Sequence, residues 1–588
     1  MFQKLCSLAV VGAIAMTAPA WAQQPLFVAY PPNNHQTTAP QIFLIGTAAP
    51  EGEVFVNGQP IPRSPAGHFA PSFPLQLGEN VFTLRHQNQE LQIRVTRNSD
   101  LPPAPVGVAF AENSLQPSVD VARMPGDRVC FSAIAPPRAT VSVQLANQTI
   151  PLSPQPLVTL PPNSAVLTGE NQPTPVEANR YQGCTLTPNT ATPLNLGQPQ
   201  FRLSLNGQTI TQTAPGSIQV LSPTPFEIAE VTAASGTART GPGTDYSRLT
   251  PLPPGTQAAI TGREGDWLRL DYGAWIRSNE TRIINSAIPP RSLIRSVRAQ
   301  QVPGWTEIRF PLQTPVPVSI DQGDRHLTLN LYNTTAQTDV IRLDDDPIIA
   351  RLDWQQVSPD RIQYRFNLKS AQQWGYKVRY EGTTLVLSLR HPPTLSRNRR
   401  QPLSGMTILI DPGHGSDEDL GARGPTGYPE KDVTLIVSKL LRDRLIERGA
   451  QVVMTREGDD DLYPQDRVDV IEQTEPHLAL SVHYNALPDQ GDALNTAGVG
   501  MFWYHPQAHS LSVFLHNYLV NRLRRPSYGV FWNNLALTRP TVAPSVLLEL
   551  GFMINPVEFE WIVNPQEQQR LATALADAVV EWVRTTQP

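Results

Sequence analysis

The apolar residues of this 588-residue chain change their spacing near Gly405. Before that point they recur at every second position in short runs, which is the period of strands with one buried face. After it, short apolar runs alternate with stretches at helical spacing, which indicates an α/β domain with a mostly parallel, twisted sheet. The sequence therefore predicts a multidomain protein in which several all-β modules precede one α/β domain.

Composition agrees with this division and narrows the classes of function. The sequence contains 59 prolines, which helix interiors exclude. Its 46 basic and 51 acidic residues give a net charge of −5, so it lacks the basic excess of a nucleic-acid-binding protein. No apolar run of about eighteen residues follows the N-terminal segment, so we expect no integral membrane span in the mature chain.

Residues 1–22 have the pattern of a secretory signal peptide. Lys4 precedes a short apolar stretch over residues 5–16, and Ala-Trp-Ala at 20–22 forms an A-x-A cleavage site. A membrane anchor is the weaker interpretation because the apolar stretch is short. We therefore expect an exported protein of the periplasm or cell envelope.

Two β domains are predicted next. Residues 23–100 contain the strings VFVNGQPI and LGENVFTL and resemble bacterial Ig-like modules, which are β-sandwiches. Residues 101–222 continue the same alternation as a second β domain. Inside it, the stretch 151–200 is rich in Pro, Thr and Asn and predicts a long irregular insertion.

The cysteines that remain after the signal peptide are Cys130 and Cys184. In an exported chain, two cysteines form a disulfide more often than a metal site. Our hypothesis is a disulfide that fixes the insertion to the second β domain.

Residues 226–285 resemble bacterial SH3-like domains, which are small β-barrels. The matching residues are Ala238–Pro242, Gly255, Trp267 and Gly273–Ile276. The family more often has Gly directly before its final Trp, whereas Ala274 stands there in this chain. The resemblance implies binding of cell-wall peptides. The alternative is that Trp267 is only a core residue, because large aromatic side chains are usually mostly buried.

The remaining segments complete the predicted architecture. Residues 290–391 resemble the β-rich wall-targeting domains that precede many cell-wall amidases. Residues 392–404 are polar and rich in Pro and Arg, which predicts a linker. Residues 405–588 form the predicted α/β domain.

Four side chains of the last domain stand at positions suited to metal chemistry. His414 follows the apolar run TILI in DPGHG, His483 follows LAL in SVHYN, and Glu549 ends the run VLLE; Glu430 opens a helix. Active sites of open α/β sheets gather at the carboxyl ends of strands. Two imidazoles and a carboxylate are a common catalytic zinc set, and a further carboxylate can take a proton from water.

These strings closely resemble the zinc-dependent N-acetylmuramoyl-L-alanine amidases over residues 406–585. The match also includes Thr455-Arg456 and the stretch from Pro544 to Phe552. The resemblance implies that His414, Glu430 and His483 bind one zinc ion and that Glu549 is the catalytic acid/base. It implies cleavage of the amide between the lactyl group of N-acetylmuramic acid and L-Ala, with peptidoglycan as the partner. The ligand types alone also suit manganese or iron.

The chain departs from the family pattern at two places. Ser416 replaces the Gly that usually follows GHG, and the loop from Asp417 to Tyr428 is long and acidic. Its carboxylates are either competing ligands or solvated loop charges, and we favour the latter. Some relatives carry a long inserted helix that plugs the site, whereas only the short stretch from Leu487 to Ala497 follows Asn485 here, so we expect no built-in plug.

Three further polar residues are candidates for substrate binding. Arg456 and Arg467 carry guanidinium groups that match the carboxylates of a stem peptide, and the equal alternative is that they hold a loop by hydrogen bonds. Asn485 either contacts substrate or shapes the turn beside His483.

Other classes of function remain as alternatives. A catalytically silent wall-binding scaffold fits the β modules, but a site that has lost its activity need not keep His414, Glu430, His483 and Glu549. A cysteine endopeptidase lacks a nucleophile, because no Cys follows residue 184. A serine hydrolase lacks a G-x-S-x-G motif. The sequence does not identify an activator protein, a nucleic-acid partner is not expected, and the oligomeric state stays open.

Overall fold

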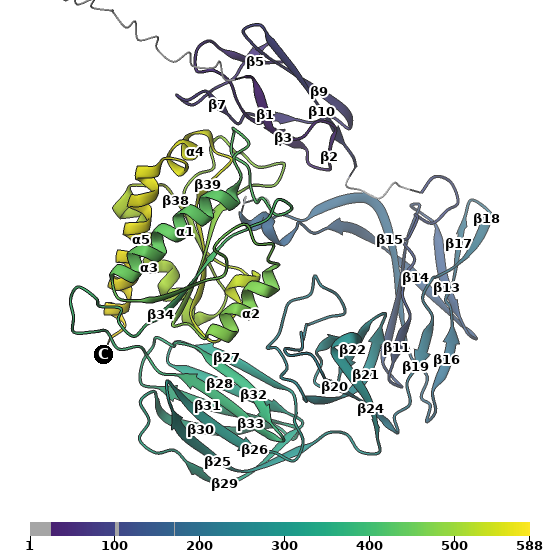
Figure 1. The fold of residues 1–588 in the computed structure, drawn as a ribbon. Helices are drawn as coiled ribbons and strands as arrows, with labels where there is room; N and C mark the ends of the chain where they lie inside the picture. Colours follow the sequence, from purple (N-terminus) through teal and green to yellow (C-terminus); the bar gives the residue numbers. More distant parts are fainter. Residues whose placement is uncertain (1–24, 100–104, 168, 170, 588) are drawn as a thin grey trace, which may run out of the picture.

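The computed structural model describes residues 25–99, 105–167, 169 and 171–587, so the predicted signal peptide over residues 1–22 lies outside the described residues. Four β-rich units precede a C-terminal α/β domain, which confirms the predicted order of a β-rich part followed by an α/β domain (Figure 1). No helix among the described residues is long and apolar enough to cross a membrane.

The first β unit packs its strands around a small apolar core. Its strands are β1 (Phe27–Tyr30), β2 (His35–Thr37), β3 (Gln41–Phe43), β4 (Ile45–Thr47), β5 (Val54–Val56), β6 (Gln59–Pro60), β7 (His68–Phe69), β8 (Ser72–Pro74), β9 (Gly78–His86) and β10 (Gln89–Arg97). The alternating residues Phe82, Leu84, Ile93 and Val95 are buried, as period-two runs require.

The second β unit is larger and contains the described cysteines. Its elements are β11 (Val121–Arg123), β12 (Arg128–Ala135), β13 (Thr140–Leu145), β14 (Gln148–Thr159), η1 (Asn163–Leu167), β15 (Thr174–Leu186), β16 (Leu194–Gly197), β17 (Gln200–Leu205), β18 (Gln208–Thr213) and β19 (Ile218–Val220). Cys130 and Cys184 are directly opposed in β12 and β15 and are joined by a disulfide.

The predicted irregular insertion over residues 151–200 is wrong for much of its length. β14 and β15 form a long antiparallel hairpin, which we call the arm, and η1 lies at its tip. Pro154 and Pro156 fall where β14 has run past its pairing with β13, which ends at Leu152. One edge of β14 is free there, and proline is tolerated on a free strand edge. The prolines therefore indicate a strand with one unpaired edge, and not an irregular segment.

The third and fourth β units follow. The third contains β20 (Phe226–Val231), β21 (Gln257–Glu264), β22 (Trp267–Leu270), β23 (Trp275–Arg277), η2 (Ser278–Glu280) and β24 (Thr281–Ser286). The fourth contains β25 (Ser292–Val302), β26 (Trp305–Pro311), β27 (Val318–Gly323), β28 (His326–Tyr332), β29 (Thr334–Arg342), β30 (Ile349–Ser358), β31 (Arg361–Leu368), β32 (Tyr376–Glu381) and β33 (Thr384–Arg390).

The second and third units share a sheet across the predicted boundary at residues 222–226. β11 pairs with β19 of its own unit on one side and with β21 of the third unit on the other. Arg123 also binds Glu264 through an ion pair. These two units are therefore joined by backbone hydrogen bonds as well as by the chain.

The α/β domain is built on a six-stranded sheet. Its elements are β34 (Thr407–Pro412), α1 (Glu430–Glu447), β35 (Gln451–Met454), α2 (Pro464–Thr474), β36 (Leu478–Asn485), β37 (Val499–Trp503), α3 (Pro506–Leu523), β38 (Ser527–Trp532), η3 (Ala536–Thr538), β39 (Ser545–Phe552), α4 (Pro556–Ile562) and α5 (Pro565–Thr585). The strand order is β35-β34-β36-β39-β37-β38. Asn555 and Asn564 cap α4 and α5 with their side-chain oxygens.

This sheet is mixed, which corrects the expected mostly parallel arrangement. β35, β34, β36 and β39 run parallel, but β37 and β38 are parallel only to each other, and β37 is antiparallel to β39. β37 follows β36 along the chain without an intervening helix and lies on the far side of β39 from it. A connection without a crossover helix is typical of antiparallel strands. The carboxyl ends of β34, β36 and β39 remain at one edge.

The predicted linker over residues 392–404 is partly packed against the α/β domain. Leu403 is fully buried in the core of that domain, and its backbone N–H donates to the carbonyl of Arg448 at 3.0 Å. Trp374, from the fourth unit, lies in the same core. The fourth unit and the α/β domain therefore have a common apolar core.

Candidate active site

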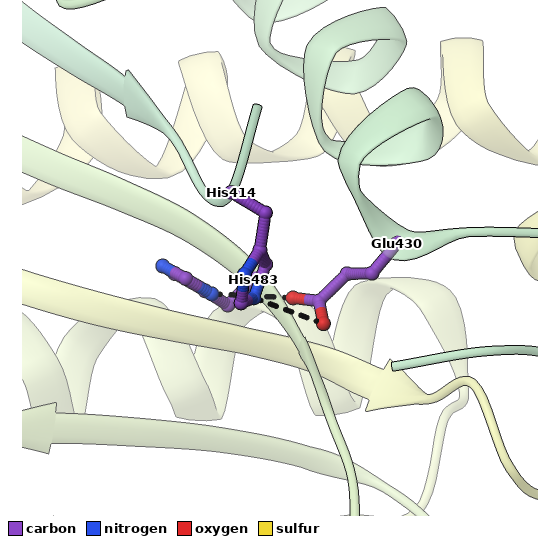
Figure 2. Close-up of side chains that lie close together, drawn as sticks. All are labelled: His414, Glu430 and His483. Carbon is purple, nitrogen blue, oxygen red and sulfur yellow. Dashed lines mark hydrogen bonds and ion pairs between the residues drawn. The ribbon is translucent and has the colours of Figure 1, made fainter. Parts of the chain in front are cut away.

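The predicted metal ligands converge at the carboxyl edge of the sheet (Figure 2). One donor atom from each of His414, Glu430 and His483 lies within 4.8 Å of the other two. The Glu430 carboxylate is 3.2 Å from His414 Nε2 through one oxygen and 3.2 Å from His483 Nδ1 through the other. Residues 16 and 53 positions apart therefore form one cluster.

Local backbone explains how the three side chains reach one another. His414 follows β34 with a φ of 58°, a left-handed conformation, and His483 lies near the end of the neighbouring strand β36. Glu430 is the first residue of α1. At Gly413, a Cβ atom would lie 2.3 Å from the His483 ring, and at Gly421 (φ +67°) it would lie 2.6 Å from Glu430 Oε2. Both positions therefore require glycine.

Backbone N–H groups fix the Glu430 carboxylate. Ala422 N–H donates to Oε2 and Tyr484 N–H donates to Oε1, each at 2.9 Å. Burial alone raises the pKa of Glu430, but the hydrogen bonds to both histidines outweigh it and hold the pKa below its usual range. Burial lowers the pKa of His414, whereas Glu430 and Asp419 together raise it to about 9. The cluster therefore provides a negative field for a cation.

Asp419 is a site residue that the sequence reasoning missed. Its carboxylate lies 2.6 Å from His414 Nδ1, on the ring nitrogen that does not face Glu430. Asp419 belongs to the acidic loop whose charges were expected to be solvated, and Asp417 of that loop is indeed exposed. Ser416 orients Asp419 by accepting a hydrogen bond from its backbone N–H at 3.0 Å. The acidic sequence of the loop indicated that a carboxylate could lie near His414. It did not indicate which one, because Asp419 is directed to the ring by the turn at Ser416.

Glu549 lies beside this cluster on β39, where it is in register with His483 of β36. Its Oε2 atom is buried and has no hydrogen-bond partner among the described residues. Burial, followed by the charge of Glu430, raises the pKa of Glu549 well above its usual value. A buried carboxylate with a raised pKa next to a ligand cluster has the properties of a general acid/base.

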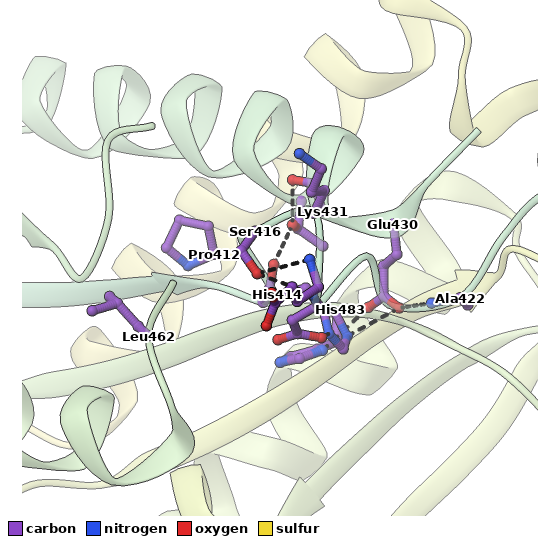
Figure 3. A network of polar contacts seen from close by, with 12 residues as sticks. Pro412, His414, Ser416, Ala422, Glu430, Lys431, Leu462 and His483 are labelled. Carbon is purple, nitrogen blue, oxygen red and sulfur yellow. Dashed lines mark hydrogen bonds and ion pairs between the residues drawn. The ribbon is translucent and has the colours of Figure 1, made fainter. Parts of the chain in front are cut away.

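Arg456 and Arg467 hold the loop that carries His414, which is the alternative role considered for them. Figure 3 shows His414 of this loop beside His483 and Glu430. The Arg456 guanidinium donates to the carbonyls of Pro412, Gly413 and Lys431. Arg467 donates to the His414 carbonyl at 2.6 Å and forms an ion pair with buried Asp411. Both side chains are buried. These contacts support loop positioning in place of stem-peptide binding.

Asn485 shapes the turn after β36, because its side-chain oxygen accepts a hydrogen bond from the N–H of Ala486 at 2.9 Å. The following segment contacts the first β unit. Asp489 accepts a hydrogen bond from the Tyr30 hydroxyl and pairs with His35 Nε2 at 2.9 Å. Neither contact had a signal in the sequence, since the partners are more than 450 positions apart.

The donor set fits a zinc ion. Two imidazoles and one carboxylate supply three ligands, and a catalytic zinc site leaves its fourth position to water or substrate. A carboxylate on the second nitrogen of a metal-binding histidine, as Asp419 provides, is a common feature of such sites. The unpartnered Glu549 Oε2 adds an acceptor next to the cluster.

Comparison with known proteins identifies the same part of the chain. The family model of N-acetylmuramoyl-L-alanine amidase matches residues 408–581. The germination-specific N-acetylmuramoyl-L-alanine amidase of Bacillus subtilis (strain 168) is 34% identical over 200 residues, which are 31% of this chain and 81% of that protein. The probable cell wall amidase LytH of Staphylococcus epidermidis (strain ATCC 12228 / FDA PCI 1200) is 32% identical over 197 residues, covering 33% of this chain and 64% of LytH.

A solved structure shows the same coverage. The N-acetylmuramoyl-L-alanine amidase from Clostridium difficile 630 is 25% identical, with 31% of this chain and 98% of that chain covered, at a TM-score of 0.30. The family model matches within the α/β domain, and the Bacillus subtilis amidase, which is 34% identical and covered over 81% of its length, shows that this chain belongs to the N-acetylmuramoyl-L-alanine amidase family.

Proposed function

We propose that the protein is a zinc-dependent peptidoglycan hydrolase that cleaves the amide between the lactyl group of N-acetylmuramic acid and L-Ala. The observation that carries this proposal is the convergence of His414, Glu430 and His483 within 4.8 Å beside Glu549, whose buried Oε2 has no hydrogen-bond partner in the described part of the chain. The three converging side chains would hold the metal. A bound zinc ion polarises a carbonyl and lowers the pKa of water towards about 7.

The residues of this chain then account for the proton transfers. Glu549 accepts a proton from the attacking water as the water oxygen bonds to the lactyl carbonyl carbon. It returns that proton to the nitrogen of L-Ala as the C–N bond breaks, which leaves a lactyl carboxylate and a free amino group. A raised pKa suits a carboxylate that must both accept and return a proton near neutral pH.

Asp419, Arg456 and Arg467 act as positioning residues in this proposal. Asp419 fixes the orientation of the His414 ring, and the two arginines hold the backbone around residues 412–414. A carboxylate that accepts the Nδ1 proton of His414 fixes the ring orientation and leaves Nε2 as the nitrogen that would face a metal. The loop is therefore organised before substrate arrives.

The third and fourth β units, with their resemblance to SH3-like and wall-targeting domains, would hold the enzyme on its polymer. Attachment to an insoluble substrate raises the local concentration of its bonds at the active site. This role requires export to the periplasm or cell envelope, as the signal-peptide pattern of residues 1–22 predicts. A catalytically silent wall-binding scaffold is the alternative function.

Digestion of purified peptidoglycan by residues 23–588 tests the proposal. We expect new L-Ala amino termini without new reducing ends, abolished by a chelator and restored by zinc. New reducing ends would indicate a glycosidase instead. Sedimentation with the wall without either product would favour the scaffold.

A matched pair of variants tests the role of Glu549. Glu549→Gln should lower turnover by about 100-fold or more and keep bound zinc, because the amide cannot accept the proton. Glu457→Gln changes an exposed carboxylate of the same domain, which pairs with Arg442, and should leave turnover unchanged. Turnover of Glu549→Gln close to that of Glu457→Gln would overturn the assignment.

A further inference from the structure

A cavity of about 620 Å³ lies where the third β unit, the fourth β unit and the α/β domain meet. In Figure 1 the third and fourth units lie on the side of the α/β domain opposite to the first unit. β37 and β38 run antiparallel to β39, so Trp532, at the end of β38, lies away from the edge that carries the metal-ligand cluster. The cavity is thus separate from the candidate active site.

Contacts between the three units fix the walls of this cavity. The N–H of Ile320 donates to Thr250 Oγ1 at 3.0 Å, which joins the fourth unit to the third. Gln322 donates to Gln507 at 3.2 Å, and the N–H of Tyr376 donates to the carbonyl of Thr541 at 2.8 Å, which join the fourth unit to the α/β domain. The size falls within the range of small-molecule sites.

The cavity has an excess of positive charge. Arg248, Arg361 and Arg539 contribute guanidinium groups from three different units, and Asp321 is the carboxylate among the described residues that line it. Asp321 already accepts a hydrogen bond from Asn330. Burial, followed by the charge of Arg248, lowers the pKa of Arg539 to about 10. A ligand that carries a negative charge would relieve this repulsion.

Several buried polar atoms of the lining have no hydrogen-bond partner among the described residues. They are the Tyr272 hydroxyl, Gln322 Oε1, Arg361 Nε and Arg539 Nε. Leaving a polar group buried and unpaired costs stability. Because these atoms have almost no accessible surface, a ligand would contact the accessible parts of the same side chains and not these atoms themselves.

Aromatic rings form two further parts of the wall. Tyr504 and Trp532 lie 5.2 Å apart between centroids, and Tyr272 and Tyr332 lie 4.7 Å apart. The Trp532 side chain is 60% exposed, although a large aromatic ring gains from burial. Flat aromatic faces next to polar donors match the apolar C–H face and the hydroxyl groups of a pyranose ring.

We propose that this cavity binds the acidic amino sugar of the glycan, in the form whose lactyl carboxylate is free. The proposal rests on the proposed function, because hydrolysis of the lactyl amide adds water across the C–N bond and leaves that carboxylate on the sugar. Arg248 and Arg539 pair with the carboxylate, and Trp532 packs on the ring. Guanidinium groups suit a carboxylate because both are planar and can form two parallel hydrogen bonds. The enzyme would then stay attached to strands that it has already processed.

Titration of the full mature chain with defined saccharides tests this site. The probes are the disaccharide of N-acetylglucosamine and N-acetylmuramic acid with a free lactyl carboxylate, neutral di-N-acetylchitobiose, and the stem peptide alone. We expect the acidic disaccharide to bind about 10-fold more tightly than the neutral one, since hydrogen bonds to charged groups contribute that much. Equal affinity for chitobiose, or tighter binding of the peptide, would overturn the proposal.

Matched variants assign the binding to this cavity. Arg248→Gln and Trp532→Ala should each weaken binding of the acidic disaccharide by about 10-fold, as loss of a charged or aromatic anchor does. Arg351→Gln and Trp354→Ala change an exposed arginine and a half-exposed tryptophan on β30, outside the cavity lining, and should leave binding unchanged. Wild-type affinity in both cavity variants would place the ligand elsewhere.

This experiment separates the failure of the two proposals. The disaccharide has no amide to hydrolyse at its lactyl group, so its binding is measured without turnover. Weaker binding of the acidic disaccharide by Arg248→Gln supports the proposed binding site even if the peptidoglycan digestion gives no new amino termini. Normal digestion of peptidoglycan together with unchanged disaccharide affinity in both cavity variants would overturn the proposed binding site and leave the proposed amidase activity intact.

Discussion

At the scale of single residues, the cluster of His414, Glu430 and His483 depends on neighbouring groups that orient its side chains. His414 is held by Asp419 on one ring nitrogen and faces Glu430 with the other. The sequence predicted that these three residues come together, because each stands in a distinctive string at a strand or helix end. It did not identify Asp419, because any of several carboxylates in that loop had the same signal.

Asp419→Asn should weaken zinc binding by about 10-fold or more, because an amide orients the His414 ring less strongly and does not raise its basicity. The affinity can be measured by competition with a chromophoric chelator. Asp417→Asn is the matched control, since Asp417 is in the same loop but is exposed and contacts Lys431 at 3.3 Å. Equal zinc affinities in the two variants would contradict this role of Asp419.

His477 gives the α/β domain a predictable pH dependence. Its Nδ1 accepts a hydrogen bond from the N–H of Thr407 at 3.0 Å, between the starts of β36 and β34. Burial, followed by the charge of Arg390, lowers the pKa of His477 from 6.5 to about 4. His477 therefore binds a proton more readily in the unfolded state than in the folded state. The stability that neutral His477 gives the folded state is complete above pH 6.5 and is lost as the pH falls towards 4.

Urea unfolding at pH 7 and pH 4.5 measures this contribution. Between these values, wild type should lose about 2 kcal/mol more stability than His477→Asn, which cannot titrate. The comparison with the variant removes the effect of carboxylates that titrate in both proteins. An equal loss in the two proteins would show that His477 does not carry the effect.

At the scale of elements, the arm shows why composition alone misleads. Its prolines suggested irregular chain, yet β14 continues as a strand where its edge is free. At its tip, the carbonyl of Leu167 accepts a hydrogen bond from the Tyr528 hydroxyl at 3.1 Å. Tyr528 lies on the edge strand β38, and its ring centroid lies 4.9 Å from that of Phe552 on β39. The spacing of apolar residues cannot predict a contact between residues 361 positions apart.

Tyr528→Phe should loosen the arm tip. Loss of one hydrogen bond of about 1 kcal/mol raises the population of the detached arm about 5-fold. Limited proteolysis followed by mass spectrometry should then show cleavage within residues 157–176 about 5-fold faster, when opening is rapid relative to cleavage. Tyr518→Phe on α3 removes a hydroxyl from another tyrosine of the same domain and should leave this rate unchanged. A similar rate in both variants would contradict the anchoring role.

The sequence predicted the helices and strands whose apolar residues recur regularly, and it missed short elements and those with few buried residues. The apolar runs located β34, β36 and β39, because each of these strands is almost entirely buried. α2, β38 and α4 were missed: α2 has few buried residues, β38 is an edge strand and α4 is short. The direction of β37 was also missed, because an apolar strand pattern is the same in either direction.

At the scale of the whole molecule, the units are joined by shared cores as well as by the chain. The first unit contributes Phe43 and Ile45 to a cluster that also contains Phe552 and Ile554 of the α/β domain. Since Phe552 ends the strand that carries Glu549, packing of the first unit reaches the active-site strand. The spacing of apolar residues within one unit predicts which side chains are buried but not which other unit covers them, so these contacts could not be predicted from the sequence.

Trp374 provides the strongest test of this coupling. It belongs to the fourth unit, is 2% exposed, and its ring centroid lies 5.3 Å from that of Trp582 on α5. Trp374→Ala should destabilise the full chain by about 3–5 kcal/mol, because it leaves a cavity in the core of the α/β domain. Hydrogen exchange should show faster opening of α5 as well as of the fourth unit. Trp354→Ala removes a 42% exposed tryptophan from the same unit and should leave exchange in α5 unchanged. If Trp374→Ala accelerates exchange only in the fourth unit, the two regions unfold independently and the common core does not couple them.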